Sequence, residues 1–284
     1  MSAAPDAPQL DGGSGFSDAL TYAFADETGE VCGVARLGLS EGGASGLVLV
    51  FRDGEPVAVQ ADGDGTPGDQ WEQVSAAGLS TETVEPDRLW RVRLAGDVGF
   101  DLEFRSVGAP IVLAADSSAA AAGGMEGNDH VCRVRGTVGG RPFTGMGQRG
   151  RSWGAPDWDR MILARTISAW FDDEHALSAV AIRSAKAKSH ADEQTSAFVL
   201  TGDEVREVGE PRLSTTYDAQ ERQRAAGLEL YVTPDDEFAL RVAGEVVAGT
   251  SLDLGRLRLD CAFFRWRMNG LEGVGRYDVL RRLE

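Results

Sequence analysis

The segment from Gly145 to Arg160, GMGQRGRSWGAPDWDR, gathers side chains that could do chemistry. It combines two Trp, three Arg and two Asp with four Gly. A carboxylic acid can donate or accept a proton, and the face of an indole ring attracts positive charge. Asp157 and Asp159 would share one face of a strand. This segment is therefore the first place to look for acid–base chemistry.

A glycine pattern in the same segment is compatible with a different function. Gly145, Gly147 and Gly150 match GxGxxG. Asp172 follows at about the spacing of a ribose-binding acid. A dinucleotide site needs a helix that begins at the glycines and points its N-terminus at the pyrophosphate. Pro156 delays any helix to about its own position, although a helix would suit the spacing of Leu163, Ile167, Trp170 and Phe171. We therefore predict no nucleotide cofactor.

The charged and aromatic side chains of the segment also have a purely structural interpretation. Arg149 or Arg151 could stack on Trp153 and pair with Asp157, which would close one end of a β-barrel. Charged clusters in proteins are often structural in this way. An end plug and a role in catalysis or ligand binding both stay open at this point.

Two histidines are possible functional groups. His130 follows Asn128 and Asp129 and could be an acid–base group, but a single His without a partner is more typical of a hydrogen-bonded or exposed side chain at the start of a strand. His175 follows a run of three acidic residues, which is typical of a solvated turn, and no second ligand group lies at a useful spacing. We predict no metal. Three widely spaced Cys indicate reduced thiols rather than disulfides.

The whole segment resembles a known signature. It is similar to G-x-R-x-x-S-W-G-x-x-D-W of bacterial tandem-lipocalin families, which are related to carotenoid hydratases (hydroxyneurosporene synthases) and more distantly to tocopherol cyclases and calycin-type fungal Diels–Alderases. The sequence NGLEGVGRYDVL also resembles their Gly-rich closing strand. Relatives commonly carry Asp-His before Ser-Trp-Gly, and this chain has Gly150-Arg151 instead, which removes an acid and an imidazole. The matching residues are Gly147, Arg149, Ser152, Trp153, Gly154, Asp157 and Trp158.

This resemblance implies a cavity for a hydrophobic, isoprenoid or polyketide-like molecule and a cofactor-independent hydration, cyclisation or isomerisation. It makes Asp157 the expected proton donor or acceptor. Further catalytic candidates are Asp159, Asp129 and His130. Two alternatives stay open, a non-catalytic carrier or sensor of such a ligand and a structural protein with filled barrels. The ligand-binding candidates are Arg149, Arg151, Trp153, Trp158, Trp170 and Trp266.

Short β-branched or aromatic runs, separated by Gly, Asp and Asn, dominate the rest of the chain. Many alternate apolar with polar residues, as half-buried antiparallel strands do. Long amphipathic helices are nearly absent, which argues against a doubly wound α/β enzyme. Hairpin turns are indicated at Asp53-Gly54, Gly139-Gly140 and Asn269-Gly270. We therefore predict an all-β protein.

An internal repeat divides this β sequence into two units. The run LWRVRLAGDVGFDLEF matches LELYVTPDDEFALRV, and GRPFTGMGQR matches NGLEGVGRYD. Closure into two consecutive lipocalin-like antiparallel barrels would remove the exposed strand edges. We predict a flexible leader at residues 1–15, a first barrel at 16–116, an Ala/Gly-rich linker at 117–127 and a second barrel at 128–284.

The composition argues against several classes of function. Lys and Arg number 28 and Asp and Glu number 45, which gives a net charge of −17 over 284 residues. Such an acidic surface repels nucleic-acid backbones and anionic membranes. No apolar run of about 18 residues and no signal-peptide pattern is present. We expect a soluble, cytoplasmic protein that binds no nucleic acid and has no integral membrane segment, and its oligomeric state stays open.

Overall fold

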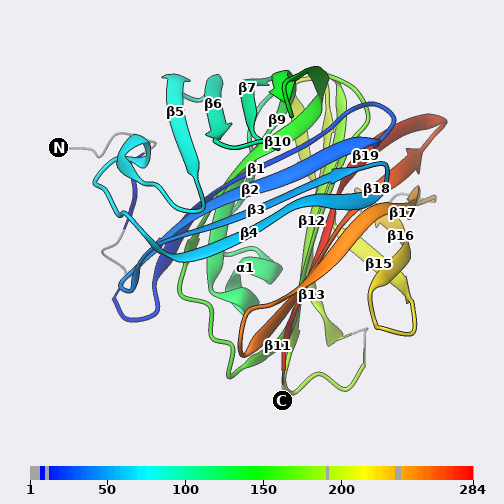
Figure 1. The fold of residues 1–284 in the computed structure, drawn as a ribbon. Coiled ribbons are helices and arrows are strands. Elements are labelled where there is room, and N and C mark those ends of the chain that lie inside the picture. Colours follow the sequence, from blue (N-terminus) through cyan, green and yellow to red (C-terminus); the bar gives the residue numbers. More distant parts are fainter. Residues whose placement is uncertain (1–6, 10–12, 190–191, 234–237, 284) are drawn as a thin grey trace.

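Antiparallel β-sheet makes up nearly all the regular structure of the chain. The computed structural model describes residues 7–9, 13–189, 192–233 and 238–283. In these ranges two curled sheets each form a lipocalin-like half-barrel (Figure 1). The predicted all-β fold of two consecutive lipocalin-like barrels is confirmed. None of the described helices is long and apolar enough to cross a membrane.

The first sheet has the order β4-β3-β2-β1-β10-β9-β7-β6-β5, with β8 paired to β9. A 3-10 turn, η1 (Trp71–Gln73), lies between β4 and β5. The strands are β1 (Ser17–Ala25), β2 (Val31–Ser40), β3 (Gly43–Arg52), β4 (Glu55–Gly65), β5 (Leu79–Glu85), β6 (Leu89–Leu94), β7 (Phe100–Ser106), β8 (Ile111–Leu113), β9 (Met125–Val138) and β10 (Arg141–Gly154).

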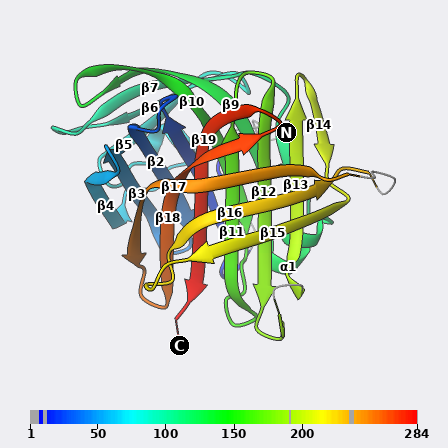
Figure 2. The ribbon, with the colours of Figure 1, turned by 90° about the vertical axis from the view of Figure 1, so that its right-hand side faces the viewer.

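The second sheet repeats this plan with the order β14-β13-β12-β11-β19-β18-β17-β16-β15. In both sheets four strands follow one another, and the last strand of the unit returns to pair with the first. Strands β15–β17 cross in front of β11–β13 in Figure 2, which shows the curl of the sheet. The strands are β11 (Met161–Trp170), β12 (His175–Ser184), β13 (Gln194–Thr201), β14 (Glu204–Glu207), β15 (Glu210–Tyr217), β16 (Gln223–Tyr231), β17 (Leu240–Asp253), β18 (Leu257–Met268) and β19 (Leu271–Arg282).

The three predicted hairpin turns are confirmed. Asp53-Gly54 joins β3 to β4, Gly139-Gly140 joins β9 to β10, and Asn269-Gly270 joins β18 to β19. Both residues of each turn have a positive φ, between 49° and 85°. Two-residue turns of this kind match the right-handed twist of the strands they connect. They fix the register of the long hairpins that carry the site.

The chain passes from one sheet to the other later than predicted. The expected linker at 117–127 forms the helix α1 (Ser118–Gly123) and the start of β9, and the second sheet begins only after β10 ends at Gly154. Alanine favours a helix as much as it suits a mobile linker. Ser117 caps the helix N-terminus by accepting a hydrogen bond from the Ala120 amide, and Gly124 ends it with φ 65°. The helix packs against β12 and β13 of the second sheet.

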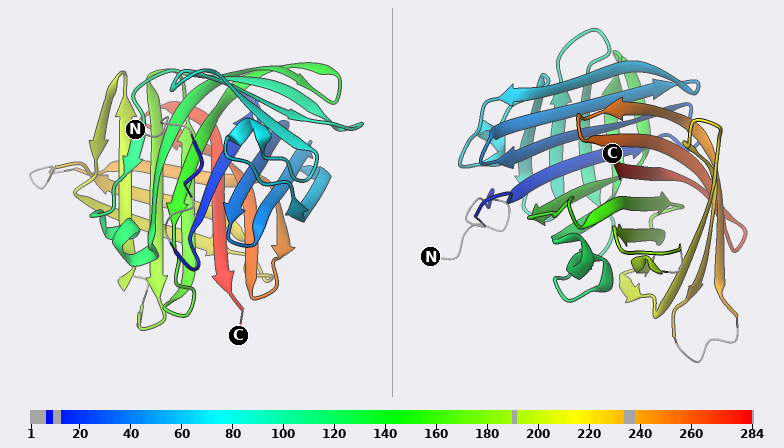
Figure 3. Two further views of the ribbon diagram at one scale, coloured as in Figure 1. Left: turned by 90° about the vertical axis from the view of Figure 1, so that its left-hand side faces the viewer. Right: turned by 90° about the horizontal axis from the view of Figure 1, so that it is seen from below.

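The described residues form four apolar clusters, of which the smallest joins Ala119 of α1 to Met161 and Ile182. Of the others, one fills the first barrel and one fills the second. The third, which we call the inter-sheet core, lies between the sheets and joins Cys32, Val34 and Phe51 of the first to Trp170 and Phe263 of the second. The two sheets and α1 are seen from below in the right-hand view of Figure 3. Strands such as β1 and β2 therefore bury both of their faces.

Candidate functional site

The signature residues of β10 divide between two environments. Side chains alternate along a strand, so Arg149, Arg151 and Trp153 point into the first barrel, whereas Gln148 and Gly150 face the second sheet. The spacing of apolar residues in 163–171 was also compatible with a helix, but these residues lie in β11 or directly after it. No helix follows the glycines, so the nucleotide-binding geometry does not form.

Inside the first barrel the signature builds a plug. Arg151 forms a fully buried ion pair with Asp18, with Nη2 2.7 Å from Oδ2, and its guanidinium lies 5.5 Å from the Trp153 ring. Arg149 stacks on Trp90 at 4.9 Å. The His130 ring lies 4.9 Å from the same indole. These side chains therefore form the structural plug that was one of the two interpretations of the segment. The carboxylate that pairs with the arginine is that of Asp18, not that of Asp157.

Asp157 and Asp159 lie in an exposed turn. Pro156 ends the extended run, and the Arg160 amide donates to the Asp157 carbonyl at 3.0 Å. The Asp157 and Asp159 side chains are 54% and 83% exposed. Asp157 accepts a hydrogen bond from the Asp159 amide, and Asp159 pairs with Arg256. Neither carboxylate lines the cavity described next, so the catalytic role predicted for them gains no support from their positions.

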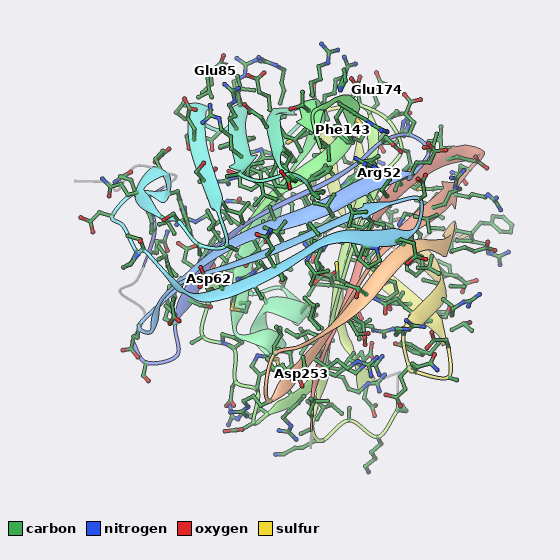
Figure 4. The ribbon with its side chains drawn as sticks, viewed as in Figure 1. Arg52, Asp62, Glu85, Phe143, Glu174 and Asp253 are labelled. Atoms are coloured by element: carbon green, nitrogen blue, oxygen red, sulfur yellow. The ribbon has the colours of Figure 1, made fainter. Side chains whose placement is uncertain are left out.

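A cavity of about 760 Å³ lies between the two sheets. This volume is in the range of small-molecule sites. The exposed residues of its lining are Ser45 of β3, Ala61 and Gly63 of β4, Thr166 of β11 and Leu254 after β17. Asp62 and Asp253, which are labelled in Figure 4, are neighbours in sequence of the exposed residues of β4 and of Leu254. Among the predicted ligand-binding residues, Arg151 and Trp158 belong to its lining, although the guanidinium of Arg151 is held by Asp18. Its apolar wall includes Ile111, Leu113, Met161, Ile182, Phe198 and Leu280.

The first sheet contributes a polar row to this cavity. Asp129 on β9 is paired with Gly150 on β10, Gly150 with Thr21 on β1, and Thr21 with Arg36 on β2. All four residues line the cavity. Because they share one register across adjacent strands, Asp129 and Arg36 stand at opposite ends of a row about 14 Å long, three strand spacings.

Asp129 is the carboxyl group best placed for acid–base chemistry. Burial raises its pKa from 3.8 to about 6, against the opposing effects of hydrogen bonds from Gln148 and Ser178 and the charges of Arg276 and Arg149. Ser178 Oγ donates to Oδ2 across the gap between the sheets, at 3.3 Å. A Cβ at position 150 would come within 2.6 Å of Asp129 Oδ1. Gly150 therefore leaves the space that the carboxyl group occupies.

The second sheet presents a matching polar row. Ser178 on β12 is paired with Ser168 on β11, and Ser168 with Arg276 on β19. Arg276 forms an ion pair with Asp278 of the same strand. Arg276 Nε and Asp278 Oδ1 are buried without a hydrogen-bond partner among the described residues. Both side chains line the cavity.

The other predicted residues lie away from this cavity. Trp170 belongs to the inter-sheet core, and Trp266 is enclosed in the second barrel. His130 faces the first barrel, on the opposite side of β9 from Asp129. Arg36 and Arg276 were not singled out by the sequence. The internal repeat contained a signal for Arg276. When the closing strands GMGQR (145–149) and GVGRY (273–277) are aligned, Arg276 matches Gln148, which lies within the signature segment.

The possible metal ligands at the acidic run before His175 form a surface turn. His175 Nδ1 lies 2.9 Å from Asp172 Oδ1, and Asp173 pairs with Arg133. No cluster of three or more His, Cys, Asp or Glu side chains suited to a metal ion occurs in the described part of the chain. Burial raises the pKa of the Cys132 thiol to about 12, so this cysteine stays protonated.

Comparison with known proteins relates this arrangement to a family. Residues 5–282 match the family described as a domain of unknown function, DUF7064. The chain belongs to the DUF7064 family. No curated protein matches it.

Several solved structures share the fold of this DUF7064 chain. A putative AttH from Nitrosomonas europaea aligns with a TM-score of 0.67 at 14% identity, over 93% of this chain and 91% of that one. CghA aligns with a TM-score of 0.68 at 11% identity, over 94% and 88%, and is also known in complex with Sch210972. Kievitone hydratase from Nectria haematococca aligns with a TM-score of 0.60 at 12% identity, over 96% and 90%. The resemblance to tandem-lipocalin proteins is confirmed.

Proposed function

We propose that the inter-sheet cavity binds a hydrophobic small molecule and that Asp129 exchanges a proton with it in a cofactor-independent hydration, cyclisation or isomerisation. The observation that carries this proposal is a carboxyl group with a pKa of about 6 on the wall of a cavity with a large apolar surface. Two structural neighbours support it, since one is named a hydratase and another binds a small molecule.

A pKa near neutrality suits a group that must both give and take a proton. In a hydration, protonated Asp129 gives its proton to one carbon of a double bond, and water adds to the other carbon. The surplus proton of that water returns to the carboxylate, so one water is gained and Asp129 is restored. In a cyclisation, a second double bond captures the cation instead, and proton loss to Asp129 ends the reaction.

Neighbouring side chains would assist these steps. Ser178 donates to Asp129 Oδ2 and stabilises the carboxylate that is left after proton transfer. Trp158 is an aromatic residue in the wall, and an aromatic face stabilises a developing positive charge. Water can reach the site because part of the lining, such as Ala61 and Gly63, is exposed.

The proposal is tested by incubating the purified protein with linear isoprenoids, carotenoid precursors and polyenes. Products are followed by mass spectrometry beside a heat-inactivated control. We expect either the gain of one water or an isomer of unchanged mass with a new retention time. Substrates that quench tryptophan fluorescence but are recovered unchanged would favour a carrier or sensor and contradict the catalytic proposal.

A further inference from the structure

Arg36 places a positive charge on the wall of the cavity without a partner of opposite charge in contact. In the ranges that the structure describes, no side chain or backbone oxygen hydrogen-bonds with its guanidinium, and it forms no ion pair. Its Nη1 lies over Gly38, where a Cβ would come within 2.8 Å of it. The glycine therefore leaves room for the guanidinium beside the cavity.

Arg276 faces Arg36 from the second sheet. The pKa of Arg36 is lowered, first by burial and then by the charge of Arg276, while Asp18 and Asp278 oppose this effect. Asp18 is already bound to Arg151, and Asp278 to Arg276. A buried charge is costly unless it is paired. The lining thus carries a surplus of positive charge around Arg36.

The remaining carboxylates of the lining do not neutralise this surplus. Asp62 accepts hydrogen bonds from the amides of Asp64 and Ala77, which hold it to its own loop. Glu126 occupies a register position of β9 that faces the first barrel, opposite to that of Asp129. Asp129 stands at the other end of the polar row, about 14 Å from Arg36, and therefore does not pair with it.

We propose that the ligand of this cavity carries a carboxylate, which Arg36 and Arg276 bind, and that its hydrocarbon part extends toward Asp129. This inference rests on the proposed function, because it orients the same ligand in the same cavity. Arg36 and Arg276 both line the cavity, and the charge of Arg276 acts on Arg36, so one carboxylate can pair with the two guanidinium groups. The row from Arg36 to Asp129 is about 14 Å long. The reacting double bond therefore lies roughly 10 Å or more from the acid head group.

The apolar wall fits this orientation. Phe198 is paired with Ser178, and Ile111 with Asp129, so both apolar side chains stand beside the proposed proton donor. The hydrocarbon end of the ligand would pack there, and its polar end would lie where Thr21, Ser168 and the arginines form the lining.

Calorimetric binding of farnesoic acid and farnesol tests the inference, because the two compounds share one hydrocarbon and differ in the head group. We expect the unmodified protein to bind the acid at least roughly tenfold more tightly, the effect of one hydrogen bond between charged groups. Arg36→Gln is expected to remove this preference by weakening the binding of farnesoic acid roughly tenfold. Arg256→Gln, at an exposed arginine paired with Asp159, is the matched control and should keep the preference.

Equal affinities for acid and alcohol in the unmodified protein would overturn the inference and leave the proposed cavity intact. A preference that survives in Arg36→Gln would also overturn it. The absence of binding by either compound would count against the proposed function as well. The comparison in the unmodified protein does not depend on how well any variant folds.

Discussion

The pKa of Asp129 is set by two opposing features, its hydrogen bonds and its burial. Ser178 and Gln148 bind its carboxylate, but burial outweighs them and raises the pKa to about 6. The folded protein therefore holds this proton more tightly than the unfolded chain does. The stabilising contribution is complete below about pH 4 and is lost as the pH rises through 6.

Asp129→Asn removes this titration because an amide stays neutral. We expect the variant to gain stability relative to the unmodified protein as the pH rises from about 4 to about 8, by at most about 3 kcal/mol. Urea unfolding at both pH values measures the difference. Asp157→Asn, at an exposed carboxylate, is the control and should show no such trend. A constant difference between Asp129→Asn and the unmodified protein would mean that Asp129 titrates normally.

Most of the signature lies on β10, which forms part of the cavity wall, but the arginine and tryptophan side chains there are on the opposite face of that strand. The signature on β10 drew attention to Arg149, Arg151 and Trp153, which close the first barrel. Asp129 was a secondary candidate because nothing in its neighbouring residues indicates that it faces a second sheet. Arg36 is a lone charged residue in a largely apolar strand, and its position opposite Arg276 depends on the packing of the two sheets.

The Gly-rich strands β10 and β19 allow each unit to close. A Cβ at Gly275 would overlap the carbonyl oxygen of Ser168 on β11, and one at Gly147 would overlap that of Ala23 on β1. These glycines are needed because neighbouring backbone occupies the place of a side chain. The same strands carry Gln148 and Arg276 to the cavity.

Gly275→Ala should therefore separate β19 from β11. We expect a loss of more than about 3 kcal/mol, as for other steric strain in a packed core, and impaired ligand binding. Gly63→Ala is the matched control, because nothing lies within 4 Å of a Cβ there. Thermal unfolding of the two variants makes the comparison, and equal stabilities would refute this role of the glycine.

Strands and hairpins were predictable because their signals are local. Period-two alternation and residues that tolerate a positive φ, such as Asn269-Gly270, act over a few positions. The helix α1 was not predicted, because the same Ala/Gly composition suits a linker and a short capped helix. Its burial against β12 and β13 decides between them, and this contact is distant in sequence.

The inter-sheet core packs the two units against each other. Phe51 and Phe263 meet edge to face across the gap, with ring centroids 6.0 Å apart, and neither is exposed. The repeat predicted two units, and the common strand order bears this out. The packing of one unit on the other was not predicted, although the run VCGVARLGL on β2 is apolar on both faces.

Phe263→Ala should destabilise the whole molecule by about 3–5 kcal/mol, because it leaves a cavity in this core. Urea unfolding followed by tryptophan fluorescence measures the change. Phe238→Ala removes the same side chain from a position that is 81% exposed, so it should change stability by less than about 0.5 kcal/mol. Similar losses in both variants would show that the sheets are not held together by this contact.

The most direct test of the central claim is the rate of product formation by the unmodified protein, Asp129→Asn and Asp157→Asn, measured on one substrate found by the mass-spectrometric screen. Asp129→Asn keeps the shape of the side chain and removes the proton. We expect it to slow turnover by a factor of about 100 or more, with substrate binding retained, and Asp157→Asn to remain fully active. Full turnover by Asp129→Asn, or loss of turnover in Asp157→Asn, would contradict the assignment of the inter-sheet cavity as the catalytic site.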